Sequence, residues 1–207
     1  MPFITFEGVE GSGKSTQLSV LADRLTARFG VVCRTREPGG TELGERLRGI
    51  LLDPAQRNLD PLAEFLLFEA DRRQHIREVV RPGIEAGGWV LCDRFSDSTE
   101  AYQAAGRGLD AKWVATIDER VRDGLVPDLT LLFDVPPLEG LARARRRDVR
   151  EGRFESEEIA FHERVALAFE AIARREPSRV VVIDARPDAV SVAERTWTAV
   201  ARRFGLS

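Results

Sequence analysis

The chain is 207 residues long, with 43 % hydrophobic and 31 % charged residues, a composition that excludes a disordered protein and suits one domain over residues 1–207. Its net charge of −3 argues against a protein that coats nucleic acid. No apolar run approaches the roughly 20 residues that cross a bilayer. Cys33 and Cys92 lack the spacing of a metal site, and the N-terminal MPFITF predicts no signal peptide. We therefore expect a cytoplasmic protein with free thiols that contacts neither membrane nor nucleic acid.

Short apolar runs alternate with longer helical patterns along the chain. The runs are Phe3–Phe6, Val31–Cys33, Trp89–Cys92, Leu129–Phe133 and Val180–Ile183. This alternation predicts an α/β fold, with a parallel sheet of about five strands and helices on both faces. Polar or glycine residues follow each run, and the carboxyl ends of parallel strands share one rim, where ligands bind.

The first apolar run leads into a glycine-rich loop and then a helix. The loop and first helical residues are Gly8, Val9, Glu10, Gly11, Ser12, Gly13, Lys14, Ser15 and Thr16, which match G-x-x-x-x-G-K-[ST]. Backbone N–H groups of such a P-loop surround a phosphate, Lys14 reaches the β- and γ-phosphates of ATP, and Ser15 holds Mg²⁺. Glu10 is unexpected, because it places a carboxylate inside an anion-binding loop.

The second run ends in Arg36-Glu37-Pro38-Gly39-Gly40-Thr41, a turn whose glycines allow close approach of a ligand. Thr41 has the chemistry of a helix N-cap. Arg46 and Arg48 in the next helix are two residues apart and face different ways, so at most one of them points at the site.

A long helical stretch, residues 60–86, starts at Asp60-Pro61 and carries apolar residues on one broad face. Phe68 and Arg72 are four residues apart, so a ring and a guanidinium lie side by side and can bind a base. The alternative is a core phenylalanine beside an exposed arginine. Thr99, Tyr102 and Gln103 share a face of a later helix, for which an exposed polar face is the alternative.

Asp93 and Arg94 end the third run, where they can hold Mg²⁺ and a phosphate; a surface ion pair is the alternative. Residues 143–153 hold six arginines and predict either a nucleic-acid patch or a lid that brings an arginine to the transferred phosphoryl group. The loop-like break around Gly152 favours the lid. His75 and His162 have no partner histidine, which predicts surface positions.

These segments together resemble the thymidylate kinases. The resemblance runs through FEGVEGSGKST, TREPGGT, LRGILLD, LLFEADR, DRFSDSTEAYQ and VIDA, in order along nearly the whole chain. It implies a five-stranded parallel sheet flanked by helices, a homodimer, and transfer of the γ-phosphate of ATP to dTMP with Mg²⁺ as cofactor. The product would be dTDP.

The resemblance also implies roles for single residues. Phe68 stacks on thymine, while Arg72, Thr99 and Gln103 contact the edge of the base. Tyr102 closes the space near C2′, and Glu10 faces the 3′-hydroxyl. Arg36, Arg48 and Arg94 hold the phosphate of dTMP, with Pro38 and Ser98 in the same site, and Ser15 and Asp93 organise Mg²⁺.

The P-loop contains no arginine, so the resemblance implies a catalytic arginine from a lid at about residues 143–155. Gly152-Arg153-Phe154-Glu155 is similar to the family's D-R-[IF]-E, which favours Arg153 as this residue over Arg147 and Arg150. Arg147 and Ala185 of VIDA are expected to contact ATP. The chain departs from the family at Gly152 and at Phe95, where tyrosine or histidine is common.

Two other functions stay open at this point. Another P-loop nucleotide or deoxynucleoside kinase is one, and a deoxynucleoside acceptor would require a base such as Glu37 near its 5′-hydroxyl. The other is a nucleic-acid-binding ATPase that uses the arginines of residues 143–153. The interrupted run and the negative net charge argue against this second function.

Overall fold

The computed structural model describes residues 2–56, 58–147 and 152–206, with only the backbone described at residue 147. Strands and helices alternate as the apolar runs predict. The strands are β1 (Phe3–Glu7), β2 (Val32–Arg36), β3 (Trp89–Asp93), β4 (Leu129–Asp134) and β5 (Val180–Asp184). The helices are α1 (Lys14–Phe29), α2 (Glu42–Leu51), α3 (Pro61–His75), α4 (Arg81–Glu85), α5 (Ser96–Thr99), α6 (Ala111–Arg122), α7 (Pro137–Arg147), α8 (Ile159–Arg175) and α9 (Ala189–Phe204). Two π-helical segments, η1 (Ile76–Val80) and η2 (Glu100–Gly106), continue α3 and α5.

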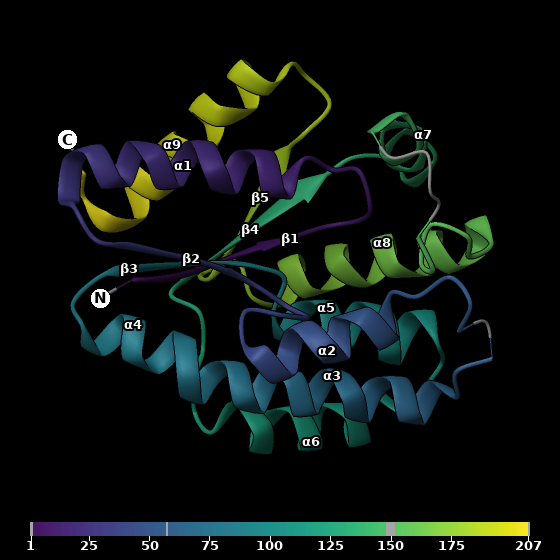
Figure 1. The fold of residues 1–207 in the computed structure, drawn as a ribbon. Coiled ribbons are helices and arrows are strands. Elements are labelled where there is room, and N and C mark those ends of the chain that lie inside the picture. Colours follow the sequence, from purple (N-terminus) through teal and green to yellow (C-terminus); the bar gives the residue numbers. More distant parts are fainter. Residues whose placement is uncertain (1, 57, 148–151, 207) are drawn as a thin grey trace.

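The five strands form one parallel sheet in the order β2-β3-β1-β4-β5, which confirms the predicted fold class (Figure 1). The central strand β1 lies between β3 and β4, so successive connections leave it in opposite directions. Ligands of open parallel sheets bind at such a point, outside the carboxyl ends of the strands. The P-loop follows β1 and therefore lies in the middle of this rim.

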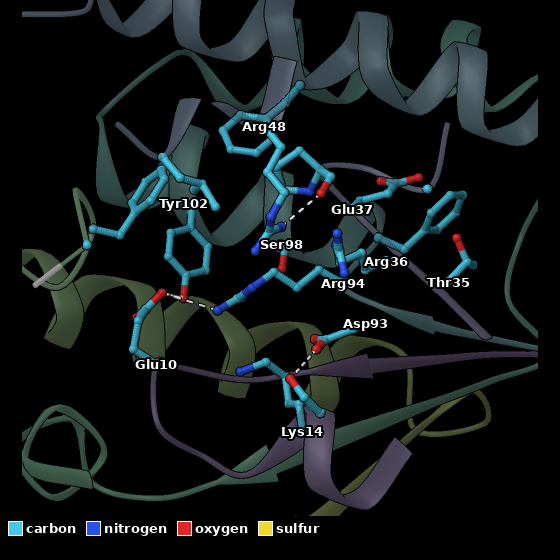
Figure 2. Close-up of a pocket in the computed structure, with 18 of the residues that line it drawn as sticks. Glu10, Lys14, Thr35, Arg36, Glu37, Arg48, Asp93, Arg94, Ser98 and Tyr102 are labelled. Atoms are coloured by element: carbon cyan, nitrogen blue, oxygen red, sulfur yellow. Dashed lines mark hydrogen bonds and ion pairs between the residues drawn. The ribbon is translucent and has the colours of Figure 1, made fainter. Parts of the chain in front are cut away.

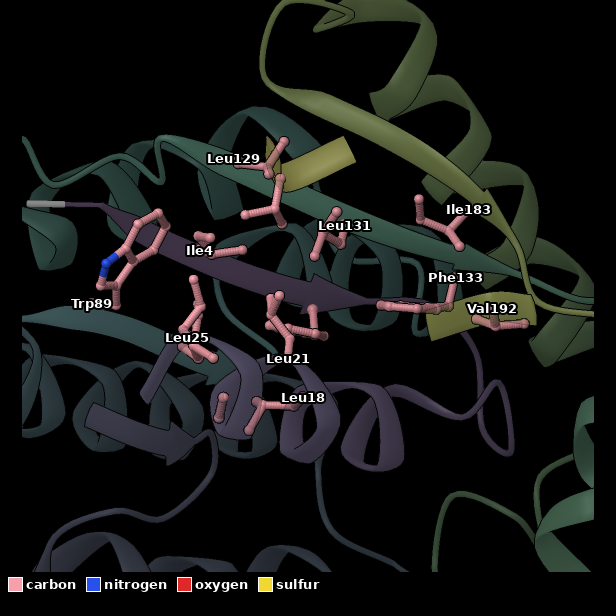
Figure 3. Packing of buried hydrophobic residues seen from close by; sticks show 14 of the residues in the cluster. Ile4, Leu18, Leu21, Leu25, Trp89, Leu129, Leu131, Phe133, Ile183 and Val192 are labelled. Atoms are coloured by element: carbon pink, nitrogen blue, oxygen red, sulfur yellow. The ribbon is translucent and has the colours of Figure 1, made fainter. Parts of the chain in front are cut away.

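The largest core cluster lies between the sheet and the pair α1 and α9 (Figure 3). Ile4, Leu131 and Phe133 of the strands meet Leu21 and Leu25 of α1. Alternate residues of β1 face opposite sides of the sheet, so Phe3 joins a second cluster with η1 and β3. Because both faces are covered, all five residues of β1 are buried and the P-loop starts from a rigid strand.

Edge strand β2 extends further than its apolar run, to Arg36. Its residues are exposed or half-buried. An edge strand can therefore contain the polar residues Arg34 and Thr35, whereas a central strand buried on both faces is apolar. Thr41 and Asp60 are N-caps, as expected: Thr41 accepts a hydrogen bond from the Gly44 N–H, and Asp60 from those at 62 and 63.

The prediction of an apolar buried face for the helix at residues 60–86 is wrong for α3. Its buried side chains are mostly charged, while Leu62 and Leu66 are 42 % and 47 % exposed. Phe68 and Arg72 of α3 line a cavity described below, and the buried charged side chains are bonded to one another rather than to solvent. In the described part of the chain, no helix is long and apolar enough to span a bilayer.

Candidate active site

A cavity of about 640 Å³ opens at the carboxyl rim of the sheet. The P-loop, the ends of β2 and β3, and helices α2 and α3 line it, together with η2 and residues 152–155. Of the residues predicted from the sequence, it brings together Glu10, Gly11, Gly13, Lys14, Ser15, Arg36, Pro38, Arg48, Phe68, Arg72, Asp93, Arg94, Ser98, Thr99, Tyr102, Gln103 and Arg153.

The P-loop wraps around the ammonium group of Lys14. Nζ donates to the carbonyl oxygens of Gly8 (3.0 Å) and Val9 (2.8 Å) and to Oγ of Ser12 (3.1 Å). Burial, with the charge of Arg94, lowers the pKa of Lys14 to about 8. A phosphate that entered the loop would add negative charge beside Lys14 and favour its ammonium form.

The predicted Mg²⁺ residues are in contact. Ser15 Oγ donates to Asp93 Oδ2 at 2.6 Å, which joins the P-loop to the end of β3. A hydroxyl and a carboxylate are the hard oxygen donors that Mg²⁺ accepts. Within the described residues, no three His, Cys, Asp or Glu side chains gather to hold a metal by themselves. The pair therefore fits an ion that is bound jointly with nucleotide phosphates.

Arg94 crosses the cavity between the P-loop and η2 (Figure 2). Its Nη1 donates to the Gly8 carbonyl and to Ser98 Oγ, both at 3.1 Å, and Nη2 donates to Glu10 Oε1 at 3.1 Å. Its backbone φ of 71° is unusual for a residue with a side chain. Strained backbone at a strand end is typical of functional sites.

Glu10 is a buried anion at the centre of this region. Its Oε1 accepts from the Tyr102 hydroxyl at 2.6 Å, and its Oε2 lies 3.3 Å from His162 Nδ1, off the hydrogen-bond direction. Burial opposes its ionisation, but the contact with His162 and the charges of Arg94 and Lys14 outweigh it and hold the pKa at about 2. The carboxylate that is unexpected in an anion-binding loop is thus bonded to Arg94 and Tyr102, both outside the loop.

The far end of the cavity has the chemistry of a base-binding site. Phe68 is partly buried, and Arg72 is 2 % exposed. Arg72 donates through Nε to Glu37 (2.9 Å) and through Nη1 to Glu69 (2.7 Å), Asp118 (2.9 Å) and Thr99 Oγ1 (2.7 Å). These bonds use Nε and Nη1, so Nη2 is the amino group with which Arg72 can meet a ligand. Arg72 is buried, which excludes the alternative of a core phenylalanine beside an exposed arginine.

The end of β2 and helix α2 supply further cations. Arg48 Nη1 donates to the Pro38 carbonyl at 2.8 Å, while Arg36 Nη2 donates to both carboxylate oxygens of Glu45 at 2.9 Å. Arg46 pairs with Glu42 on the exposed side of α2. Only one arginine of the pair at 46 and 48 reaches the cavity, as the spacing predicts.

Arg153 lines the cavity, and its guanidinium is hydrogen-bonded to groups of the protein itself. Its guanidinium donates to Glu64 Oε2 (2.5 Å) and to the carbonyl oxygens of Leu51 (3.2 Å) and Gln56 (3.1 Å). These bonds tie residue 153 to α2 and α3. The predicted catalytic role of Arg153 stays a prediction.

Three other predicted residues lie away from the centre of the cavity. Thr16 is exposed on α1, Val9 packs in a core cluster beside the P-loop, and the Ala185 carbonyl accepts from Arg143 Nη1 at 2.7 Å. The side chain of Arg147 and the whole of residue 150 fall outside the described residues.

The surface positions expected for His75 and His162 are wrong. Both rings are buried, at 0 % and 1 % exposure. His75 Nδ1 bonds Glu37 Oε1 at 2.8 Å, and its Nε2 bonds Thr35 Oγ1 at 2.6 Å. The groups that face these rings are carboxylates and a hydroxyl from distant elements rather than other histidines.

Sequence reasoning also missed buried acids that position the predicted side chains. Glu7, at the end of β1, accepts from the Phe95 N–H at 2.7 Å and from Ser98 Oγ at 2.6 Å. Burial and the nearby Asp97 raise the pKa of Glu7 to about 8. Glu64 and Glu69 of α3 were missed as well. The sequence signal that could have identified Glu64 and Glu69 is the presence of acidic residues inside the otherwise apolar segment LAEFLLFEAD.

Comparison with known proteins agrees with this geometry. The family model described as thymidylate kinase matches residues 6–195. Curated relatives include the thymidylate kinase of Solidesulfovibrio magneticus, 50 % identical over 206 residues that cover 97 % of this chain and 99 % of that protein. The thymidylate kinase of Deinococcus radiodurans is 50 % identical over 202 residues, with 97 % of each chain covered.

A solved structure is similar as well. The crystal structure of thymidylate kinase from Ehrlichia chaffeensis superposes with a TM-score of 0.80 at 36 % identity, and the match covers 96 % of this chain and 97 % of that one. The matches extend over nearly the full length and include every element that lines the cavity. This chain belongs to the thymidylate kinase family.

Proposed function

We propose that the protein phosphorylates dTMP to dTDP with ATP as phosphate donor and Mg²⁺ as cofactor. The observation that carries the proposal is the position of Arg94. It donates to the P-loop, at the Gly8 carbonyl and at Glu10, and on its other side to Ser98 of α5, in the cavity that continues to Phe68 and Arg72. A guanidinium between two nucleotide sites can hold an acceptor phosphate beside the γ-phosphate of ATP.

The reaction needs little from the protein except position and charge. An ionised oxygen of the acceptor phosphate attacks the γ-phosphorus, a new P–O bond forms, and the bond to the β,γ-bridging oxygen breaks with its electron pair on ADP. Lys14 binds the transferred and leaving groups, and Arg94 and Arg48 hold the acceptor. Mg²⁺, bound with Ser15 and Asp93, would neutralise developing charge. A phosphate oxygen is already ionised at neutral pH, so the acceptor requires no base.

A deoxynucleoside acceptor is not favoured. Its 5′-hydroxyl would require a base, and Glu37 was the candidate. In the structure Glu37 is 4 % exposed, with one oxygen bonded to Arg72 and the other to His75. A carboxylate held in this way positions Arg72 and is not free to accept a proton from a substrate.

The family relation and the cavity together support three further parts of the proposal. Residues 1–207 act as one P-loop kinase domain, and they act in the cytoplasm, where their nucleotide substrates occur. The catalytic arginine comes from the lid at residues 143–155, because the P-loop has none. The protein works as a homodimer, supported by exposed apolar side chains on α2, α3 and α6.

The test is a coupled assay of ADP release with the purified protein against every nucleoside monophosphate and against thymidine. We expect activity with dTMP, weaker activity with dUMP and none with thymidine. A preference for AMP or CMP would contradict the assignment of the base site. Arg94→Lys keeps the charge but loses the two-sided geometry, and we expect kcat/KM for dTMP to fall at least tenfold, about 1.4 kcal/mol.

A further inference from the structure

Glu64 of α3 lies behind the base-binding end of the cavity and is completely buried. Its Oε1 accepts from Gln103 Nε2 at 2.9 Å. Both of its oxygens also accept from Arg107 Nε, at 3.1 and 3.2 Å, and Oε2 accepts from Arg153 Nη2 at 2.5 Å. Glu64 does not line the cavity, whereas Gln103 does.

The hydrogen bonds around Glu64 decide what it can offer to Gln103. Both of its oxygens accept from guanidinium groups, and a carboxylate only accepts hydrogen bonds. The side-chain amide of Gln103 has one end that donates and one that accepts. Facing an acceptor, it must turn its NH₂ group towards Glu64, and its carbonyl oxygen Oε1 then faces away from Glu64.

The wall of the base site therefore presents two groups of opposite kind. Arg72 offers the donor Nη2, because Nε and Nη1 are bonded to carboxylates. Gln103 offers the acceptor Oε1. Thymine and uracil carry an acceptor, O4, beside a donor, N3–H, on the edge that pairs with adenine. Cytosine carries the reverse, an amino group beside an unprotonated N3. Its amino donor would therefore face the donor of Arg72, and its N3 acceptor would face the acceptor of Gln103.

We infer that Glu64 is a specificity-determining residue of this enzyme. It fixes the amide of Gln103 so that the site accepts a pyrimidine with an N3–H donor and rejects cytosine. Glu64 touches no substrate and acts through Gln103, so it is a positioning residue. The bond from Gln103 to Glu64 does not involve Arg107 or Arg153, which donate to the same carboxylate. The inference rests on the proposed function, because it assumes that the base lies between Phe68 and Gln103.

The experiment compares kcat/KM for dTMP, dUMP and dCMP in the wild type, Glu64→Gln and Glu64→Asp. In Glu64→Gln the new amide can donate as well as accept, so Gln103 is free to turn. We expect the ratio of dTMP to dCMP to fall about tenfold, while the ratio of dTMP to dUMP stays constant, since both bases carry N3–H. Aspartate still only accepts, so Glu64→Asp should retain the wild-type preference even if activity drops.

Arg107→Gln is the matched control. It removes an ionic contact of the same buried carboxylate but leaves the bond between Glu64 and Gln103. We expect it to lower thermal stability without changing the ratio of dTMP to dCMP. Equal losses with all three nucleotides in Glu64→Gln, or a change of ratio in Arg107→Gln as large as that in Glu64→Gln, would overturn the inference.

Gln103→Leu tests the same geometry if Glu64→Gln does not fold. The loss should affect dTMP and dUMP and leave the low activity with dCMP unchanged; an equal loss with dCMP would mean that Oε1 does not meet N3–H. Failure of the proposed function is distinct, because the wild type itself would then not phosphorylate dTMP.

Discussion

Buried acids are the feature that stands out among the single residues of this protein. Glu7, Glu64 and Glu69 each lie beneath a side chain that faces the cavity, and each accepts hydrogen bonds from it or from its loop. Burial raises the pKa of Glu69 to about 7 and that of Glu7 to about 8. The contribution of these two acids to folding therefore depends on pH.

The stability of the protein without ligand should reflect the raised pKa of Glu7. Between pH 5 and 7 the native state keeps a proton on Glu7 that the unfolded chain, with a carboxyl pKa of 4.5, has released. Native protein thus binds more protons than unfolded protein, and this group makes the free energy of unfolding fall as pH rises. The contribution is at most about 1.4 kcal/mol per pH unit.

Glu7→Gln removes the titration and keeps the shape. We expect urea unfolding of this variant to show a smaller decrease of the free energy of unfolding from pH 5 to 7 than the wild type. Lys14, with a pKa of about 8, and Glu10, with a pKa of about 2, titrate outside this window. Parallel pH profiles for the two proteins would contradict the assignment of a neutral Glu7.

At the scale of elements, α7 is packed directly on the P-loop. A Cβ added to Gly11 would lie 1.9 Å from the Gly140 carbonyl oxygen, and one added to Gly140 would lie 2.3 Å from that of Glu10. Arg143 of α7 also donates to the carbonyl oxygens of Ala185 and Arg186, after β5. The helix that leads to residues 148–151 is thus positioned by the backbone of the ATP-binding loop.

Gly140→Ala should separate α7 from the P-loop. We expect a loss of about 1–3 kcal/mol in the free energy of unfolding, from overpacking against backbone. We also expect a lower kcat/KM for ATP, measured by steady-state kinetics, because the P-loop or the helix must shift. A change confined to KM for dTMP would place the effect elsewhere.

Gly49→Ala is the control for this change. Gly49 is also a helical glycine, but on the exposed side of α2, and nothing lies within 4 Å of its added Cβ. Alanine there should stabilise the protein by about 0.5–1 kcal/mol and leave the kinetics unchanged. The same response at both positions would show that α7 tolerates a side chain against the P-loop.

For the whole molecule, three neighbouring helices carry five exposed large apolar side chains. Leu43 and Ile50 of α2, Leu62 and Leu66 of α3, and Trp113 of α6 are each 39–47 % exposed. Helices α2, α3 and α6 lie together on the lower side of the molecule in Figure 1. Clustered apolar side chains on a surface are typical of protein–protein interfaces. This face is where we place the contact of the homodimer.

Leu66→Glu should weaken the dimer, because a charge would be buried at the centre of this face. We expect light scattering to give a mass of twice the 23.1 kDa chain for the wild type and a shift towards one chain for the variant. Val190→Glu, on α9 and 74 % exposed, is the control and should leave the mass unchanged. A wild-type mass of one chain at all concentrations would contradict the homodimer.

The sequence by itself determined the fold class, the P-loop and the order of the cavity-lining segments, because these depend on local pattern: apolar runs, glycine spacing and helical periodicity. It also placed Phe68, Arg72, Tyr102 and Gln103 on common helix faces, as the structure confirms. Such signals span a few residues and are legible before the chain folds.

Only the tertiary structure decided which group each charged side chain meets. His75 was expected at the surface and is buried between Thr35 and Glu37, and Arg153 is bonded to Glu64 of α3. These partners lie between 38 and 89 residues apart in the chain. Pairing of charges depends on which elements pack together, so the acids that position the active site become visible only once the sheet and its helices are assembled.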